Sequence, residues 1–338
     1  MHTSIKQVRV LRHPWETSDP FLFCAYHRDQ YPKGKPDMSP KASLAGRSLG
    51  QDFGGKDGWS MYHGTKVPGF PAHPHAGFET ITIVTEGLVD HSDSLGAAGR
   101  FGNGDVQWMT AGKGVQHAEM FPLLNENEGN PFELFQIWLN LPKASKKVDP
   151  HYKMLWNEDI PVATIKDGQD RTTKIKIVAG DYNDTKALEP TPDSWAADPA
   201  NGLAVWIIEM EADATFTLPT ANEGLNRALF YYSGEGVEIE GKNIAKSHAI
   251  ELHSHLDTEI KNGNTTSHFL LLQGKPMNEP VAQYGPFVAN SQQEIQELMY
   301  DFQRTQFGGW PWESPAKVHP KERGRFALHV DGKEELKD

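Results

Sequence analysis

The amino-acid sequence predicts an all-β protein made of two β-barrel domains in tandem, followed by a helix near its C-terminus. Short segments of strand character are separated by turns rich in glycine throughout most of the chain. The 338 residues are enough for about two domains. One segment near the end has the 3.6-residue apolar periodicity of a helix.

The strand segments differ in pattern, but each ends at turn residues. Residues 80–85 alternate isoleucine with threonine and stop at a Glu-Gly pair. Residues 135–141 place apolar side chains on one face and Gln136, Trp138 and Asn140 on the other. Residues 203–210 are rich in β-branched and aromatic side chains, and residues 228–232 run into a Gly-Glu-Gly turn. Such closely spaced strands favour sandwich or barrel domains.

The helix is expected to begin at Asn290 and Ser291. Glu294 stands at the capping-box distance from Ser291. An apolar stripe follows, formed by Ile295, Leu298, Met299 and Phe302. The segment 141–150, rich in lysine and proline, is expected to join the two domains, which we place at residues 1–145 and 146–338. Residues 27–58 are polar and rich in glycine and proline, which predicts a long surface loop or a flap.

Composition excludes several classes of function. The formal net charge is −12, with no concentrated basic segment, so direct nucleic-acid binding is not expected. Cys24 is the only cysteine, which excludes an intrachain disulfide and a cysteine-based zinc site, and we expect it to be a buried small hydrophobe. The first 20 residues contain no apolar stretch and no apolar run is long enough to span a bilayer, so we expect a cytoplasmic protein without membrane contact.

Three histidines and a glutamate stand at spacings that suit a metal ion. His73 and His75 are two residues apart, so on an extended strand their imidazoles project from one face. His117 and Glu119 repeat this spacing about 40 residues later. If the two strands pair or face each other, they bring together three neutral imidazoles and one carboxylate. Such a set without a thiolate suits Fe(II), Mn(II), Ni(II) or Cu(II) better than a structural zinc.

The sequence around these residues resembles that of a known family. A His-x-His pair followed by a glutamate, and later by Gly-x2-His, is the cupin signature. The stretches His73–Thr80, Glu86–Gly87, His91–Ser94, Gly104–Met120 and Gln283–Asn290 closely resemble the pirin family, and the resemblance extends from about residue 19 to residue 307. It implies a bicupin, that is, two cupin β-barrels, with iron held only in the N-terminal one by His73, His75, His117 and Glu119. The family often has arginine where this chain has Ala76, which would remove a cation from the rim of the site.

The carboxylate position has two candidates. The general cupin spacing points to Glu79, whereas the strand geometry and the resemblance to pirins favour Glu119. If Glu119 is the ligand, Glu79 is expected either to hydrogen-bond to a residue that binds the metal or to make a surface contact. His91 is expected to be structural. The pair His253 and His255 imitates the ligand pair in the second domain, but no matching Gly-x2-His-x-Glu segment follows it and only His268 is nearby, so we expect that domain to lack a complete metal site.

Two aromatic groups have alternative interpretations. Trp108 and Met109 could line a substrate cavity, although core packing is the more frequent role at strand spacing. Phe53 and Trp59 could belong to a lid over the site. The acidic residues 331–338 are expected to form a solvated tail.

The resemblance implies two functions of different class. Pirin-like proteins include quercetin 2,3-dioxygenases, which open a flavonol ring with dioxygen and release carbon monoxide. On this hypothesis Glu119 is the catalytic base for a small aromatic substrate, and Fe(II) is the expected ion, with Mn, Ni, Cu or Co as alternatives. The family also includes a nuclear cofactor of transcription factors, so the alternative is an iron-sensing protein that regulates a protein partner without catalysis. We expect a monomer in either case.

Overall fold

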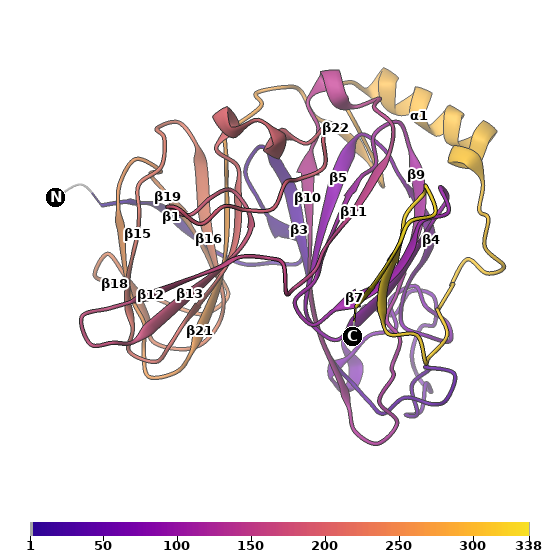
Figure 1. Ribbon diagram of the computed structural model, residues 1–338, viewed down its shortest axis with the longest axis horizontal. Helices are drawn as coiled ribbons and strands as arrows, with labels where there is room; N and C mark the ends of the chain where they lie inside the picture. Colours follow the sequence, from indigo (N-terminus) through magenta and orange to yellow (C-terminus); the bar gives the residue numbers. More distant parts are fainter. Residues whose placement is uncertain (1–2, 338) are drawn as a thin grey trace. The chain divides into compact units, whose positions relative to one another are not determined.

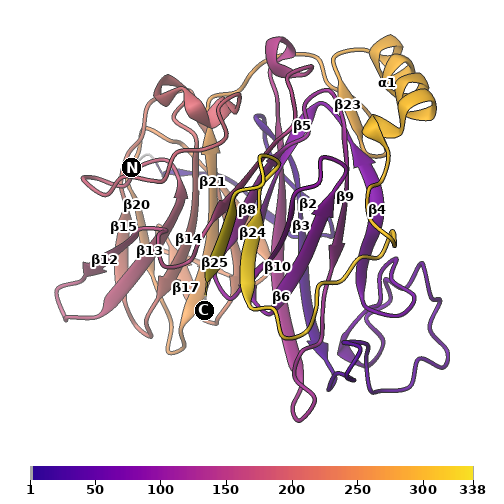
Figure 2. The ribbon, with the colours of Figure 1, turned by 45° about the vertical axis from the view of Figure 1, so that its right-hand side comes forward.

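The computed structural model describes residues 3–337 and consists mostly of β-strands, with α1 (Gln292–Thr305) as the α-helix of that part of the chain (Figures 1 and 2). The predicted all-β class and the C-terminal helix are confirmed. The strands form two compact units. The first comprises the chain up to Cys24 together with Glu158–Asn278, and the second comprises Ala25–Asn157 and the chain from Glu279 onward.

Each unit is therefore built from two separate stretches of sequence. The segment 141–150, expected to be a junction, lies within the second unit, where Lys146 is buried and its Nζ donates to Gly77 O and Asn140 Oδ1. Each unit takes residues from both halves of the chain, so the two units do not correspond to a division of the sequence at one residue. The division after residue 145 stays a prediction.

The first unit encloses its core between a seven-stranded and a four-stranded antiparallel sheet. The larger sheet has the order β1 (Ile5–Val10), β19 (His248–Leu252), β16 (Asn226–Ser233), β21 (Ser267–Gly274), β14 (Ala204–Met210), β13 (Thr172–Ala179) and β12 (Val162–Lys166). The smaller sheet has the order β15 (Thr215–Leu218), β20 (Thr258–Lys261), β17 (Val237–Ile239) and β18 (Lys242–Ile244). Alternate residues of both sheets, such as Trp206, Leu229, Phe216 and Ile260, meet in one buried cluster.

The second unit also consists of two sheets. One joins β11 (His151–Leu155), β8 (Val106–Thr110), β5 (Phe78–Glu86), β10 (Asn130–Asn140) and the part of β3 (Phe21–Tyr31) that begins at Ala25. The first residues of β3 belong to the first unit, where Phe23 and Cys24 pair with β2 (Trp15–Glu16). The other has the order β25 (Glu334–Lys337), β24 (Arg325–Leu328), β7 (Ala98–Gly102), β6 (Leu88–Asp93), β9 (Val115–Met120) and β4 (Gly69–His75). Of these strands only β25 falls in the segment 331–338, and there Glu334–Lys337 pairs with β24 as an edge strand, so the expectation of a solvated tail is wrong for those four residues.

The helix forms where the sequence predicts it. Ser291 is its N-cap and accepts a hydrogen bond from Glu294 N, while Glu294 Oε2 accepts from Asn290 N. The predicted apolar stripe packs on the hairpin of β22 (Ala282–Tyr284) and β23 (Phe287–Ala289). Figures 1 and 2 show α1 at one end of the strands of the second unit. None of the helices in the described part of the chain is both long and apolar enough to cross a bilayer.

The expected long loop begins later than residue 27, because β3 continues to Tyr31. The chain between β3 and β4 is mostly irregular, and contacts between its own residues hold it in place. The Arg47 guanidinium lies 3.3 Å from the centre of the Trp59 ring, and its Nη1 is 2.9 Å from Asp52 Oδ2. Cys24 is fully buried, as expected, and burial raises the pKa of its thiol.

Candidate metal centre

The register of β4 and β9 brings the three predicted histidines together. His73 lies directly opposite His117 in this antiparallel pair, and His75 projects from the same face of β4 two residues later. One ring nitrogen from each histidine lies within 4.8 Å of the other two. The Nε2 atoms of His73 and His75 are 3.1 Å apart. The three imidazoles therefore form a group that could hold a metal ion.

The chemical state of these side chains fits a metal. Burial lowers the pKa of His73 to about 4 and the pKa values of His75 and His117 well below the usual range, so all three rings are neutral at neutral pH. A neutral imidazole is the form that binds metal. Neither ring nitrogen of the fully buried His117 has a hydrogen-bond partner among the described residues. A buried nitrogen without a partner is costly, and a metal bond would satisfy one of the two.

Glu119 lies beside this group and is held by two other strands. Its Oε2 is 3.6 Å from His117 Nε2 and accepts a hydrogen bond of 2.6 Å from Gln136 Nε2 on β10. Its Oε1 accepts a longer bond of 3.4 Å from Thr82 Oγ1 on β5. Burial raises the pKa of this carboxyl, and the two hydrogen bonds act in the opposite direction. Glu119 does not belong to the set of atoms that all lie within 4.8 Å of one another.

Glu79, the competing carboxylate, lies on the other face of β5. Strand alternation separates it from Thr82, whose hydroxyl reaches Glu119. Its Oε1 accepts a hydrogen bond of 2.6 Å from Thr110 Oγ1 within the same sheet. The geometry thus supports the preference for Glu119, which stays a prediction as a metal ligand.

His91, which was expected to have a structural role, lies close to the three histidines. It is opposite Glu119 across β6 and β9, and its ring centre is 5.6 Å from that of His117. Its Nε2 is 3.3 Å from Asp93 Oδ2, and its ring stacks on Tyr152. These contacts fix the ring and are consistent with the structural role.

Sequence reasoning missed the residues of the facing sheet that complete the site. Thr82 and Gln136 are direct cross-strand neighbours, and both donate to Glu119. Trp138, the next residue along on the same face of β10, meets the His75 ring edge-on with ring centres 5.2 Å apart. The sequence pattern that could have pointed to these residues is the alternation of Gln136, Trp138 and Asn140 with the apolar residues of the other face of β10.

Ala76 is not at an open rim in this chain. It is fully buried in the apolar cluster of the hairpin and helix, together with Phe287 and Phe307. Its amide donates to Pro286 O, and its carbonyl accepts from Val288 N. The C-terminal hairpin thus holds the end of β4 immediately after His75.

The other predicted residues lie apart from the histidine group. Trp108 and Met109 are buried, in agreement with core packing. Trp59 is buried in the loop core, whereas Phe53 is half exposed and contacts Tyr62 and His63. His253 and His255 lie in the first unit with ring centres 5.7 Å apart, and their structural role stays a prediction.

Comparison with known proteins establishes the family. The Pirin family matches residues 5–139, and the Pirin C-terminal cupin domain matches residues 205–308. The "Putative quercetin 2,3-dioxygenase PA2418" of Pseudomonas aeruginosa is 35% identical over 71% of this chain and 79% of its own length. Pirin of Homo sapiens is 33% identical over 73% of this chain and 80% of its own. A crystal structure of quercetin 2,3-dioxygenase from Acinetobacter baumannii, 28% identical, superposes with a TM-score of 0.71 over 91% of this chain and 99% of the other. The chain belongs to the pirin family and is a bicupin with an N-terminal and a C-terminal cupin domain.

Proposed function

We propose that this protein is a metal-dependent dioxygenase of the quercetin 2,3-dioxygenase type, which cleaves a flavonol-like aromatic substrate with dioxygen. The observation that carries the proposal is the group of three neutral imidazoles with a buried carboxylate beside it. The substrate class comes from the relatives named as quercetin 2,3-dioxygenases. The cytoplasmic location and the monomeric state remain predictions.

His73, His75, His117 and Glu119 would hold the ion. Three nitrogen ligands and one oxygen ligand suit Fe(II), which we expect, and also Mn(II), Co(II), Ni(II) and Cu(II). When bound, Fe(II) supplies Lewis acidity and one-electron chemistry for reaction with dioxygen. The protein supplies neutral ligands because burial keeps the imidazoles unprotonated.

Glu119 is suited to accept the proton of the flavonol 3-hydroxyl. The short bond from Gln136 fixes its Oε2, whereas the longer bond from Thr82 leaves Oε1 more weakly held. Oε1 is therefore the atom to which we assign the proton. The raised pKa strengthens the carboxylate as a base, since the buried anion is less stable than in water.

The aromatic side chains near the histidines support a flat substrate. Trp138 stacks on Phe78 with ring centres 3.9 Å apart and touches the edge of His75. Trp138, held in this way beside His75, is the ring against which we expect a flat aromatic ligand at the metal to pack.

The test is the variant Glu119→Gln, loaded anaerobically with Fe(II) and then given quercetin and oxygen. Loss of the proton acceptor should lower turnover by about 100-fold or more, with iron content near that of the wild type, because the glutamine amide oxygen stays in place and can still bind the ion. Loss of flavonol absorbance and release of carbon monoxide measure turnover. His117→Ala should lose both iron and turnover, and Glu86→Gln, the same change at an exposed residue, should lose neither.

Full turnover by Glu119→Gln would contradict the proton-transfer role. Wild-type protein that holds iron but does not open the flavonol ring would contradict the dioxygenase activity. That second result would favour the iron-sensing alternative, in which the ferrous and ferric forms differ in affinity for a protein partner.

A further inference from the structure

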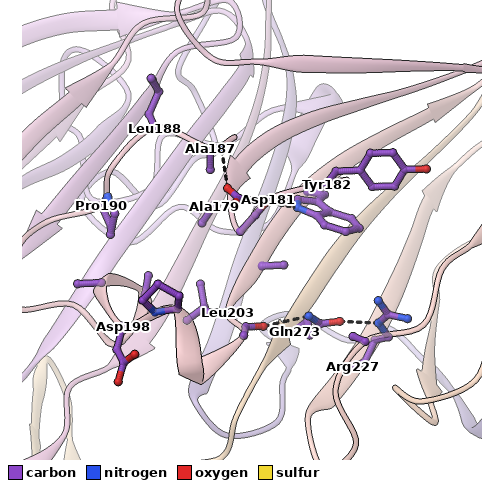
Figure 3. A pocket seen from close by; sticks show the side chains of 18 of the residues that line it. Ala179, Asp181, Tyr182, Ala187, Leu188, Pro190, Asp198, Leu203, Arg227 and Gln273 are labelled. Atoms are coloured by element: carbon purple, nitrogen blue, oxygen red, sulfur yellow. Dashed lines mark hydrogen bonds between the residues drawn. The ribbon is translucent and has the colours of Figure 1, made fainter. Parts of the chain in front are cut away.

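The first unit contains a cavity of about 510 Å³ at one end of its barrel, far along the chain from the histidine group. The chain segments 179–190 and 196–206 form much of its wall, and Arg227 of β16 and Gln273 of β21 form the inner part. Figure 3 shows Arg227 and Gln273 on one side of the view, with Pro190 and Asp198 on the other. Its size is within the usual range for small-molecule sites.

Arg227 is a buried cation in this wall. Its side chain belongs to the inward face of β16, in line with Leu229 and Tyr231, and the residue is only 3% exposed. Its Nε donates to Gln273 Oε1 at 2.6 Å, and its Nη1 donates to Pro219 O at 2.7 Å. The Gln273 amide is itself fixed, because its Nε2 donates to Gly202 O at 2.9 Å. The guanidinium is thus held in one orientation.

The charge of Arg227 is not neutralised by a contact. No carboxylate of the described residues lies within ion-pair distance of it, and its Nη2 has no hydrogen-bond acceptor in that part of the chain. Asp257 acts on it only from a longer range, and burial lowers its pKa to about 10. A buried cation with no opposite charge in contact with it is costly, so the position indicates a ligand that supplies the negative charge.

The acidic residues of the wall do not supply that charge. Asp181, Glu189 and Asp198 are all exposed. Asp181 pairs with Lys186 at 2.8 Å and accepts from Ala187 N, while Asp198 accepts from Ala200 N. Their charges face solvent, where water and salt weaken their effect on a buried group.

Apolar side chains make up a further part of the wall. Leu203, Ala204 and Trp206 line it from one segment, and Ala179 and Leu188 line it from another. We propose that this cavity binds a small organic carboxylate with a compact apolar body, its carboxylate accepting hydrogen bonds from Arg227. A planar guanidinium with a free edge matches a carboxylate well, and the apolar wall favours an organic anion over an inorganic one.

The first experiment titrates the full chain, treated with a chelator so that no metal competes for the ligand, with benzoate in a calorimeter. Benzamide, which has nearly the same shape but no charge, should bind at least 10-fold more weakly than benzoate. Arg227→Gln should also weaken benzoate binding by at least 10-fold. The control Arg171→Gln makes the same change at a residue of this unit outside the cavity and should bind benzoate as the wild type does.

Equal affinity for benzoate and benzamide would overturn the proposal, as would unchanged benzoate binding by Arg227→Gln or no saturable binding by the wild type. If Arg227→Gln does not fold, crystals of the wild type grown with 4-bromobenzoate replace it. Anomalous bromine signal in this cavity, with the carboxylate against Arg227, is the expected result. Bromine elsewhere or absent would refute the site. Binding in this cavity does not involve the three histidines, so its presence or absence can be told apart from a failure of the dioxygenase proposal.

Discussion

Gln136 controls how the carboxylate of Glu119 lies. Its amide makes the shortest hydrogen bond to that carboxylate, at 2.6 Å, from the sheet opposite the histidines. The Trp138 indole donates to Gln136 Oε1 at 3.2 Å, which fixes the amide in turn. A chain of contacts from Trp138 through Gln136 to Glu119 thus positions an oxygen beside His117. Residues that hold a metal ligand in this way contribute to metal affinity without touching the ion.

We expect Gln136→Leu to lower the affinity for Fe(II) by about 10-fold or more, the usual effect of losing a group that orients a ligand. The leucine fills the space but cannot donate, so Glu119 is free to turn away from the imidazoles. Competition with a chromophoric chelator under anaerobic conditions measures the affinity. Gln107→Leu is the matched control, because Gln107 is a buried glutamine of the same sheet without a bond to Glu119. Equal iron affinity in the two variants would show that Gln136 does not position the carboxylate.

At the scale of elements, the turn between β4 and β5 connects the histidine pair to the C-terminal hairpin. Gly77 follows His75 and Ala76 in the left-handed region, with φ of +84°. A Cβ atom there would lie 1.9 Å from Val288 O of β23, far inside contact distance. The hairpin can approach β4 this closely only because residue 77 is glycine.

Gly77→Ala should therefore reduce the free energy of unfolding by roughly 3 kcal/mol, from backbone strain together with the steric clash. Chemical denaturation of the chelated protein measures this change. The control is Gly54→Ala, since a Cβ at Gly54 meets no atom within 4 Å and that residue does not have a positive φ. Two variants of equal stability would mean that the hairpin moves away at little cost.

The same elements show how far the sequence could predict this structure. The apolar stripe and capping box of α1 are local patterns, and each formed as expected. The facing of His73 and His117 follows from the two-residue spacing once β4 and β9 pair. Thr82 and Gln136 reach Glu119 from the opposite sheet, and no local pattern encodes contacts between residues 37 and 17 positions apart.

Local sequence patterns also could not predict which distant segments pair. Strand β25 pairs with β24 at the edge of a sheet of the second unit, although its short, charged sequence resembled a tail. An edge strand buries little apolar surface, so its hydrophobic pattern is weak. The cavity beside Arg227 was also missed, because a single arginine in a strand carries no signal until the fold shows it to be buried.

At the scale of the whole molecule, the buried histidines connect stability to pH. Their pKa values lie below the ordinary value in the folded chain, at about 4 for His73, because burial disfavours the charged rings. Between about pH 6.5 and pH 4 the unfolded chain therefore binds more protons at these sites than the folded chain. Asp29 acts in the opposite direction, since burial raises its pKa to about 6 and the folded chain takes up that proton first.

We thus expect the metal-free protein to lose stability as the pH falls from about 6.5 towards 4, by at most about 1.4 kcal/mol per pH unit for each histidine. Urea unfolding at several pH values in the presence of a chelator measures the slope. His73→Asn removes one of these titrating rings, so its stability should fall less steeply than that of the wild type. His255→Asn, at an exposed residue, should leave the slope unchanged. Parallel pH dependences for the wild type and His73→Asn would show that His73 takes up its proton at the same pH in the folded and unfolded chains, which would contradict the lowered pKa of its ring.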